Sequence, residues 1–477
     1  MIHSPLAALA ALALPVLALS ACSMAPKYVA PAPPVPVSWP VGDAYLAQSE
    51  ASLPLVSYRE IFQDQRLQSL VEQALANNRD LRVAAANLAA ARAQVRVVRA
   101  NQFPAIGVGG SATRTETNGR NGGSAATVTG DRSSYSLQGG ISSFELDFFG
   151  KYASATQAQR DTALSTEAAA RTVRLGLVAD LAQAWADYAA DKDLLEIARA
   201  TAASAERSVT LTGARLQGGV APRTDLRQAE QVLETARGDV ASQTTALAQD
   251  VNAIRLLVGA DFDESLLPGS LDEVNRSLAV LPAGTSSRVL LRRPDVVEAE
   301  YLLRAANADI GTARAQLFPS ISLTGLLGVA SNALSSLFDK GAFSATLGAS
   351  ADWSIFNAGG RVANVEVAKA QRDAALASYE KAIQTAFSEV ADALADQGTL
   401  AERLRAVSRF TEAASDTARL TEASYRQGIT SSLENLDAQR SLYSARQQEI
   451  AVRRALAGNR ITLYRVLGGD QASPAQE

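Results

Sequence analysis

The chain has 477 residues, of which 47% are hydrophobic, and its 45 Lys and Arg against 49 Asp and Glu give a formal net charge of −4. This composition excludes intrinsic disorder, and the near-neutral charge argues against a nucleic-acid partner, which normally requires a basic surface. The single His and the single Cys, His3 and Cys22, lie in the first 22 residues. The rest of the chain therefore lacks a Ser-His-Asp triad, a cysteine nucleophile and a Cys or His metal site, and we expect no enzyme, no metal and no cofactor.

The N-terminus has the pattern of an export signal. Residues 6–21 form an apolar run that suits a signal-peptide core and is shorter than the about 20 residues of a membrane-spanning helix. The run ends at Leu19-Ser20-Ala21-Cys22, which resembles the bacterial lipoprotein box, in which the cysteine is lipidated. We predict a signal peptide over 1–21 and a covalent lipid such as palmitate on Cys22. The alternative is an ordinary secretory signal that leaves Cys22 as a free thiol.

The residue after the cysteine is Ser23 and not Asp, which in lipoproteins implies the outer membrane of a Gram-negative bacterium. Residues 26–40 are Pro-rich and are predicted to be extended, within a linker over 22–56. No stretch after Cys22 has 18 consecutive apolar residues. A body that crosses a membrane must therefore do so as a β-barrel.

The chain contains an internal repeat. The segment RLLVGAD at 255–261 matches YRVLGGD at 464–470, and Gly259 and Gly468 are 209 residues apart. Upstream, residues 99–104 match residues 314–319 at an offset of 215. We place the two structural repeats at 57–270 and 271–470, followed by a C-terminal tail at 471–477.

Each copy has the same predicted elements in the same order. The first copy is predicted to contain a helix from its N-cap Asp80 to Gln102, strands over 104–116 and 133–147, and helices over 154–216 and 222–258. The second is predicted to contain a helix over 295–317 with Asp295 as N-cap, strands over 319–330 and 341–356, and helices over 362–425 and 431–467. The two central helices approach ~95 Å, a length that is stable only when packed along neighbouring helices.

The strands alternate between apolar and small polar residues. From Phe343, one set of alternate positions reads Phe, Ala, Leu, Ala, Ala, Trp, Ile, and the other reads Ser, Thr, Gly, Ser, Asp, Ser. This pattern suits a water-filled lumen on one side and lipid on the other, and a soluble half-buried sheet gives the same alternation. Four strands cannot close a barrel, and an open edge is not viable in lipid, so we expect oligomers of eight or twelve strands.

The sequence resembles the TolC-like outer-membrane efflux channels, particularly the lipidated NodT-type outer membrane factors. Besides the lipoprotein box, the resemblance is carried by Phe-Pro at 103–104 and 318–319, FELDFFG at 144–150, WSIF at 353–356, YRQG at 425–428, LDAQR at 436–440 and LGG at 467–469. It implies an α+β membrane protein that is a homotrimer, with four transmembrane strands per chain in a twelve-stranded barrel and long periplasmic helices in a tunnel.

The resemblance also implies a function. Family members are the exit ducts of tripartite pumps, so we expect a part in transmembrane efflux and multidrug resistance. The implied partners are a periplasmic adaptor (membrane fusion protein) and an inner-membrane transporter of the resistance-nodulation-division type, together with outer-membrane lipid.

The turns between the long helices are the predicted site of control. Gly218, Gly219 and Gly428 suit left-handed helix ends, and Ser431 with Glu434 has the spacing of a capping box. Taken alone, these residues indicate no more than tight turns.

A gate is predicted on the helix that follows the second turn. Leu433, Asp437 and Arg440 lie at i, i+4 and i+7 and share one helical face. Taken alone, Asp437 indicates an exposed helix carboxylate. The family resemblance implies that Leu433 and Asp437 form constricting rings, in which three carboxylates would repel anions and attract cations.

The resemblance further implies a lock that holds the tips shut. Its expected members are Tyr425, Arg426, Thr224 and Asp225, and Thr430 stands where the family has Arg.

Two other classes of function remain open. An enzyme would have to use carboxylates such as Glu389, Asp392 and Asp396, although helical carboxylate metal sites normally include His. A structural coiled-coil trimer anchored to the outer membrane would show the same long helices without conducting.

Overall fold

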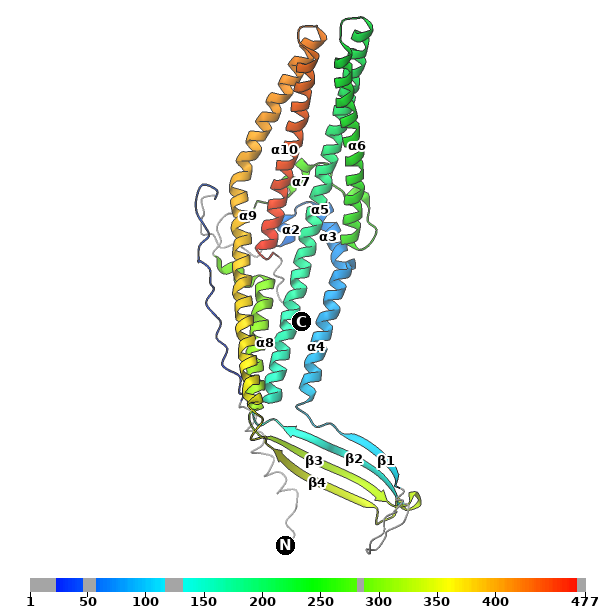
Figure 1. Cartoon of the computed structure of the whole chain (residues 1–477), viewed down its shortest axis with the longest axis vertical. Coiled ribbons are helices and arrows are strands. Elements are labelled where there is room, and N and C mark those ends of the chain that lie inside the picture. The colour runs from blue at the N-terminus through cyan, green and yellow to red at the C-terminus, as the bar shows by residue number, and fades with distance from the viewer. Residues whose placement is uncertain (1–22, 46–56, 116–131, 281–286, 470–477) are drawn as a thin grey trace. The chain divides into compact units, whose positions relative to one another are not determined.

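A computed structural model describes residues 23–45, 57–115, 132–280 and 287–469 (Figure 1). The predicted signal peptide, the predicted lipid site Cys22 and the tail at 471–477 lie outside the described residues. The chain divides into two compact units: the described residues within 1–31, 88–166 and 299–378 form the first unit, and those within 32–87, 167–298 and 379–477 form the second. Each unit takes residues from both copies of the sequence repeat.

The first unit contains a four-stranded antiparallel sheet. Its strands pair in the order β1 (Gly107–Thr115), β2 (Arg132–Leu146), β3 (Ser320–Ser331) and β4 (Phe343–Asp352). All four lie within a few residues of their predicted positions. In the described part of the chain, β1 pairs only with β2 and β4 only with β3, so the sheet has two open edges.

The register of the sheet gathers the apolar side chains on one face. Val329 of β3 stands opposite Leu137 of β2 and Phe343 of β4, and alternate residues along each strand follow on that face. A bulge between Ile141 and Phe144 adds one residue of β2 against β3. Ile141 and Phe144 are three residues apart and would lie on opposite faces of a regular strand. Because the bulge takes up one residue, both side chains lie on the same face. The other face carries mainly Ser, Thr and Gly.

Four helices contribute residues to both units. They are α4 (Arg79–Ala100), α5 (Lys151–Gln217), α8 (Pro294–Ala315) and α9 (Gly360–Arg426). α5 and α9 have 67 residues each, slightly longer than predicted. Within the described residues, no helix combines the length and hydropathy that crossing a bilayer requires.

The predicted N-caps of α4 and α8 are wrong. Asn78 caps α4, because its Oδ1 accepts hydrogen bonds from the amides of Asp80 at 2.8 Å and Leu81 at 3.1 Å. α8 begins at Pro294, which places Asp295 inside the first turn. There its carboxylate pairs with the buried guanidinium of Arg293 at 2.7 Å, so this ion pair takes up the side chain expected to cap the helix.

The second unit holds the largest buried side chains. Besides parts of the long helices, it contains α2 (Tyr58–Ile61), α3 (Gln65–Asn77), α6 (Arg223–Val258), α7 (Leu271–Ser277), α10 (Ser432–Val466), and the short 3₁₀ helices Glu264–Leu266 and Ser287–Arg292. Trp185 of α5 is fully buried and donates its indole N–H to the Leu266 carbonyl at 3.0 Å. Phe62 meets the buried ring of Tyr464 edge-on, with ring centroids 5.1 Å apart. α2, α3 and α7 were not predicted from the sequence.

Glycine at position 140 is required by the sheet. Gly140 has a φ of +143°, and a Cβ there would lie 2.2 Å from the Gly325 carbonyl oxygen on β3. We expect Gly140→Ala to destabilise the protein by at least the ~1–3 kcal/mol of a strained backbone, because the clash adds to it. Thermal unfolding followed by circular dichroism measures the effect. The control is Gly109→Ala on β1, where a Cβ meets nothing within 4 Å; equal melting temperatures for the two variants would contradict the prediction.

Candidate functional site

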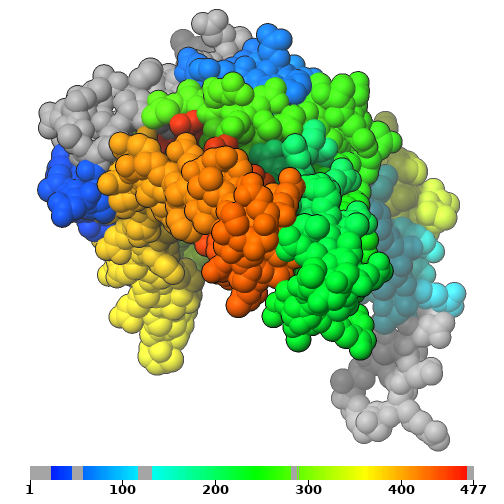
Figure 2. All heavy atoms as spheres, turned by 90° about the horizontal axis from the view of Figure 1, so that it is seen from above, coloured from blue at the N-terminus to red at the C-terminus, as the bar shows by residue number. Residues whose placement is uncertain are grey.

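Two helical hairpins in the second unit end in turns of the same geometry, and Figure 2 shows their tips side by side in green and orange. The φ of Gly219, between α5 and α6, is +74°, and that of Gly428, between α9 and α10, is +80°. Both glycines therefore have the left-handed conformation that the sequence predicts. In each turn the amide after this glycine donates to a carbonyl five residues earlier. These bonds join Val220 to Arg215 and Ile429 to Ser424, both at 2.9 Å.

The second helix of the second hairpin, α10, has side-chain N-capping that α6, the second helix of the first hairpin, lacks. The Ser431 hydroxyl accepts from the Glu434 amide at 3.2 Å, and the Glu434 carboxylate accepts from the Ser431 amide at 3.2 Å. This reciprocal pair is the predicted capping box. α6 begins after Pro222 without a side-chain cap.

A cluster of contacts joins the end of α9 to α5. The Tyr425 side chain is buried, and its hydroxyl lies 3.1 Å from the Thr212 hydroxyl. Arg215 donates from Nη2 to the carbonyls of Tyr425 at 2.7 Å and Arg426 at 3.3 Å. The Arg215 guanidinium also lies over the Tyr425 ring, 4.3 Å from its centroid. Within one chain, these contacts fix the two tips to each other.

The structure gives two members of the predicted lock other partners. Tyr425 contacts α5, and Arg426 forms an ion pair with Glu422 of its own helix. In the described part of the chain, no hydrogen bond joins either residue to Thr224 or Asp225. A link to those two residues stays a prediction.

Thr212 and Arg215 were not expected from the sequence. They lie near the end of α5, outside every motif that the sequence analysis used. Only the packing of α9 against α5 reveals their part in the site.

The predicted gate residues share an open face of α10. The Leu433 side chain is 57% exposed, Asp437 and Arg440 are also exposed, and the neighbouring Leu436 is buried. Arg440 donates to the Asp437 carboxylate at 3.0 Å. An exposed pair of this kind contributes only ~0.2–1 kcal/mol to stability. It nevertheless places a positive charge beside the Asp437 carboxylate, and this pairing was not predicted from the sequence.

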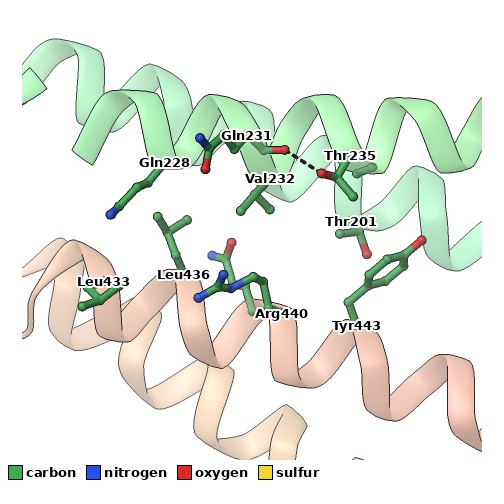
Figure 3. Close-up of a pocket in the computed structure, with 11 residues that line it drawn as sticks. Thr201, Gln228, Gln231, Val232, Thr235, Leu433, Leu436, Arg440 and Tyr443 are labelled. Carbon is green, nitrogen blue, oxygen red and sulfur yellow. Dashed lines mark hydrogen bonds between the residues drawn. The ribbon is translucent and has the colours of Figure 1, made fainter. Parts of the chain in front are cut away.

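The same face borders a cavity of about 390 Å³ between α10 and the α5–α6 hairpin (Figure 3). Leu433 and Tyr443 lie at opposite ends of the close-up, with Leu436 and Arg440 between them. The Tyr443 hydroxyl donates to the Asp239 carboxylate on α6 at 2.7 Å. The hairpins are thus bridged both at their tips and below the cavity.

A group of three carboxylates lies farther along the same helices. Asp187 and Asp191 of α5 lie near Asp250 of α6, and Arg454 of α10 contacts Asp187 at 2.7 Å. Burial, together with the charge of Asp191, raises the pKa of Asp250 to about 7. Burial also raises the pKa of Asp191. The spacing of Asp187 and Asp191 places them on one helix face, but only the fold brings Asp250 to them.

Among the residues that the structure describes, no group of three or more His, Cys, Asp or Glu side chains is arranged to hold a metal ion.

Comparison with known proteins identifies close relatives along almost the whole chain. The sequence model of the family described as outer membrane efflux protein matches residues 70–260 and 285–469. The antibiotic efflux pump outer membrane protein ArpC of Pseudomonas putida is 42% identical over 464 residues, which cover 97% of this chain and 95% of ArpC. The cation efflux system protein CusC of Escherichia coli K12 is 38% identical over 454 residues, which cover 95% of this chain and 97% of CusC.

Solved structures agree with these matches. A crystal structure of CusC has a TM-score of 0.82 and 37% identity, and the match covers 94% of this chain and 100% of that one. The outer membrane channel MtrE of Neisseria gonorrhoeae, in a structure described as its open state, has a TM-score of 0.82 and 32% identity, covering 94% and 98%.

Removing Arg215 should loosen the tips. Arg215→Ala deletes two hydrogen bonds and a cation–π contact to the end of α9, so we expect amide hydrogen exchange at residues 424–428 to accelerate about tenfold. Arg223→Ala is the control, because Arg223 is an exposed arginine at the same tip. Exchange at 424–428 that is the same in both variants would show that Arg215 does not hold the tips together.

The carboxylate group should make stability depend on pH. The folded-state pKa of Asp250, about 7, exceeds its ordinary value of 3.8, so the folded protein binds more protons between these values. Stability from this group is present below pH ~4 and is lost as pH rises through 7. We expect Asp250→Asn to raise the melting temperature at pH 8 and to have a smaller effect at pH 5. The exposed Asp396→Asn is the control, and an identical shift at both pH values for Asp250→Asn would exclude this titration.

Proposed function

The chain belongs to the outer membrane efflux protein family, and we propose that it works as a homotrimer forming the exit duct of a tripartite efflux pump. As a member of this family it is an outer-membrane efflux channel, a component of an efflux pump that provides a transport duct and not an enzyme active site.

The open sheet is the observation that supports an oligomer, and membership of the family favours three chains over two. β1 and β4 are edges in the described chain, and unpaired backbone groups are not tolerated in lipid. The apolar face is exposed in the single chain, with Leu347 at 91% and Val108 at 80% exposure. In this proposal, three chains pair their edges into a twelve-stranded barrel, and the exposed apolar face contacts lipid.

The gate is proposed at the tip of α10. Three copies of Leu433 would narrow the opening sterically, since this apolar side chain is exposed in the single chain. The ion pair between Arg440 and Asp437 means that three guanidinium groups would accompany the three carboxylates. We therefore expect the ring to select for cations only weakly.

Opening of the gate would require the hairpins to separate. The contacts of Tyr425 with Thr212 and Arg215 hold α9 against α5, and a partner at the tips would have to replace them. A periplasmic adaptor, joined to an inner-membrane transporter of the resistance-nodulation-division type, is the proposed partner. The relatives named for antibiotics and for cations have similar chains, which supports the proposal that the transporter and not the duct selects the cargo.

The anchor is proposed to be a covalent lipid on Cys22. This residue is the only cysteine of the chain and precedes the first described residue, Ser23. A lipid there would tether the protein to the outer membrane in addition to the sheet.

Single-channel recording in planar bilayers tests the duct and the gate together. We expect the wild type to conduct weakly, and Leu433→Ala combined with Asp437→Ala to raise the conductance several-fold, because both residues would narrow the opening.

The control is Leu420→Ala, which shortens an exposed leucine of α9 away from the proposed ring. A double variant that conducts no better than the wild type would place the gate elsewhere. If neither protein conducted, the non-conducting coiled-coil trimer would be favoured instead.

A further inference from the structure

A cationic cavity of about 310 Å³ lies in the first unit. Its walls come from the extended segment 26–31 and from α8 and α9. Four lining residues carry positive charge, Lys27, Arg314, Lys369 and Arg372, and none of the lining residues is acidic. The proposed channel function does not use this cavity.

The positive charges of the cavity are mostly uncompensated. Arg314 donates to the Met24 carbonyl at 3.2 Å, which is a neutral acceptor. Arg372 pairs with the adjacent Asp373 at 3.0 Å, but its Nε is buried and has no hydrogen-bond partner. Within the described residues, Lys27 and Lys369 form no ion pair. Because four positive side chains and no acidic one line it, the cavity is suited to an anionic ligand rich in acceptor oxygens.

The wall formed by the N-terminal segment is held in place. Asn307 donates to the Pro26 carbonyl at 2.8 Å, and the Arg304 guanidinium lies 5.0 Å from the centre of the Tyr28 ring. A Cβ on Gly311 would lie 2.6 Å from the Ala25 amide nitrogen, so only glycine permits this approach of the backbone. Lys27 is therefore carried by a fixed segment.

The cavity is close in sequence to the proposed anchor. Lys27 follows Cys22 by five residues, so even a fully extended chain places its backbone within ~18 Å of the cysteine. A lipid on Cys22 would hold this cysteine at the membrane surface, where the phosphates of anionic lipids are concentrated. Arginine and lysine side chains are the usual ligands of such phosphates.

We propose that this cavity binds the headgroup phosphate of an anionic glycerophospholipid of the outer membrane. The inference rests on the proposed lipid anchor, which places the cavity at the membrane. The Arg372 guanidinium and the two lysines, which line the cavity, would supply the positive charge that faces the phosphate.

Native mass spectrometry of the full-length lipidated protein tests the proposal. We would titrate phosphatidylglycerol, phosphatidylcholine and inorganic phosphate separately. We expect phosphatidylglycerol to bind at least tenfold more tightly than phosphatidylcholine. The combined Lys369→Gln and Arg372→Gln variant should lose most of this preference, and Lys27→Gln, which leaves α9 unchanged, should weaken it.

The matched control is Arg403→Gln combined with Arg405→Gln, which removes two exposed charges from α9 outside the cavity. Equal binding of the two lipids, or undiminished phosphatidylglycerol binding by both cavity variants, would overturn the proposal. Inorganic phosphate binding as tightly as phosphatidylglycerol would overturn the assignment to a lipid.

The same spectra separate this inference from the proposed function. The intact mass reports whether Cys22 is lipidated, and bilayer recording reports whether the protein conducts. A lipidated, conducting protein without a preference for phosphatidylglycerol would overturn the cavity proposal alone.

Discussion

Unpaired backbone groups at the two edges of the sheet are the constraint on which the structure depends. In the described chain β1 and β4 each have a neighbour on one side only. An amide or carbonyl without a partner costs several kcal/mol in hydrocarbon, and no side chain can remove that cost. The bulge beside Ile141 and the register of β3 keep one continuous apolar face across all four strands. In the proposed trimer, the edges of neighbouring chains pair with one another symmetrically.

The second unit combines a rigid core with tips that are held by few contacts. Trp185 and Tyr464 are completely buried in its core. At the tips, Arg215 binds backbone carbonyls of α9, and Tyr425 shares one hydroxyl contact with Thr212. Regions held by a few polar contacts open at lower free energy than a packed core. This distribution allows the hairpins to move while the rest of the unit stays folded.

Local features of the site could be predicted because they depend on neighbours in the sequence. A left-handed glycine at 219 or 428 and the capping box of Ser431 with Glu434 are each decided within one turn of helix. The N-cap of α4 is different, because Asn78 and Asp80 are both suitable residues. Asn78 is selected by the fold, since its side-chain nitrogen Nδ2 also donates to the Leu257 carbonyl at 2.8 Å.

The sequence by itself determined the order and approximate bounds of the strands and long helices, the positions of the tip turns and the shared face of Leu433 and Asp437. Periodicity and glycine placement carry that information along the chain. Only the tertiary structure decided that Tyr425 meets Thr212, that Arg215 binds the carbonyls at the end of α9, and that Asp250 joins the carboxylates of α5. The physical reason is that such contacts join side chains from separate helices, and no sequence period specifies which of them meet.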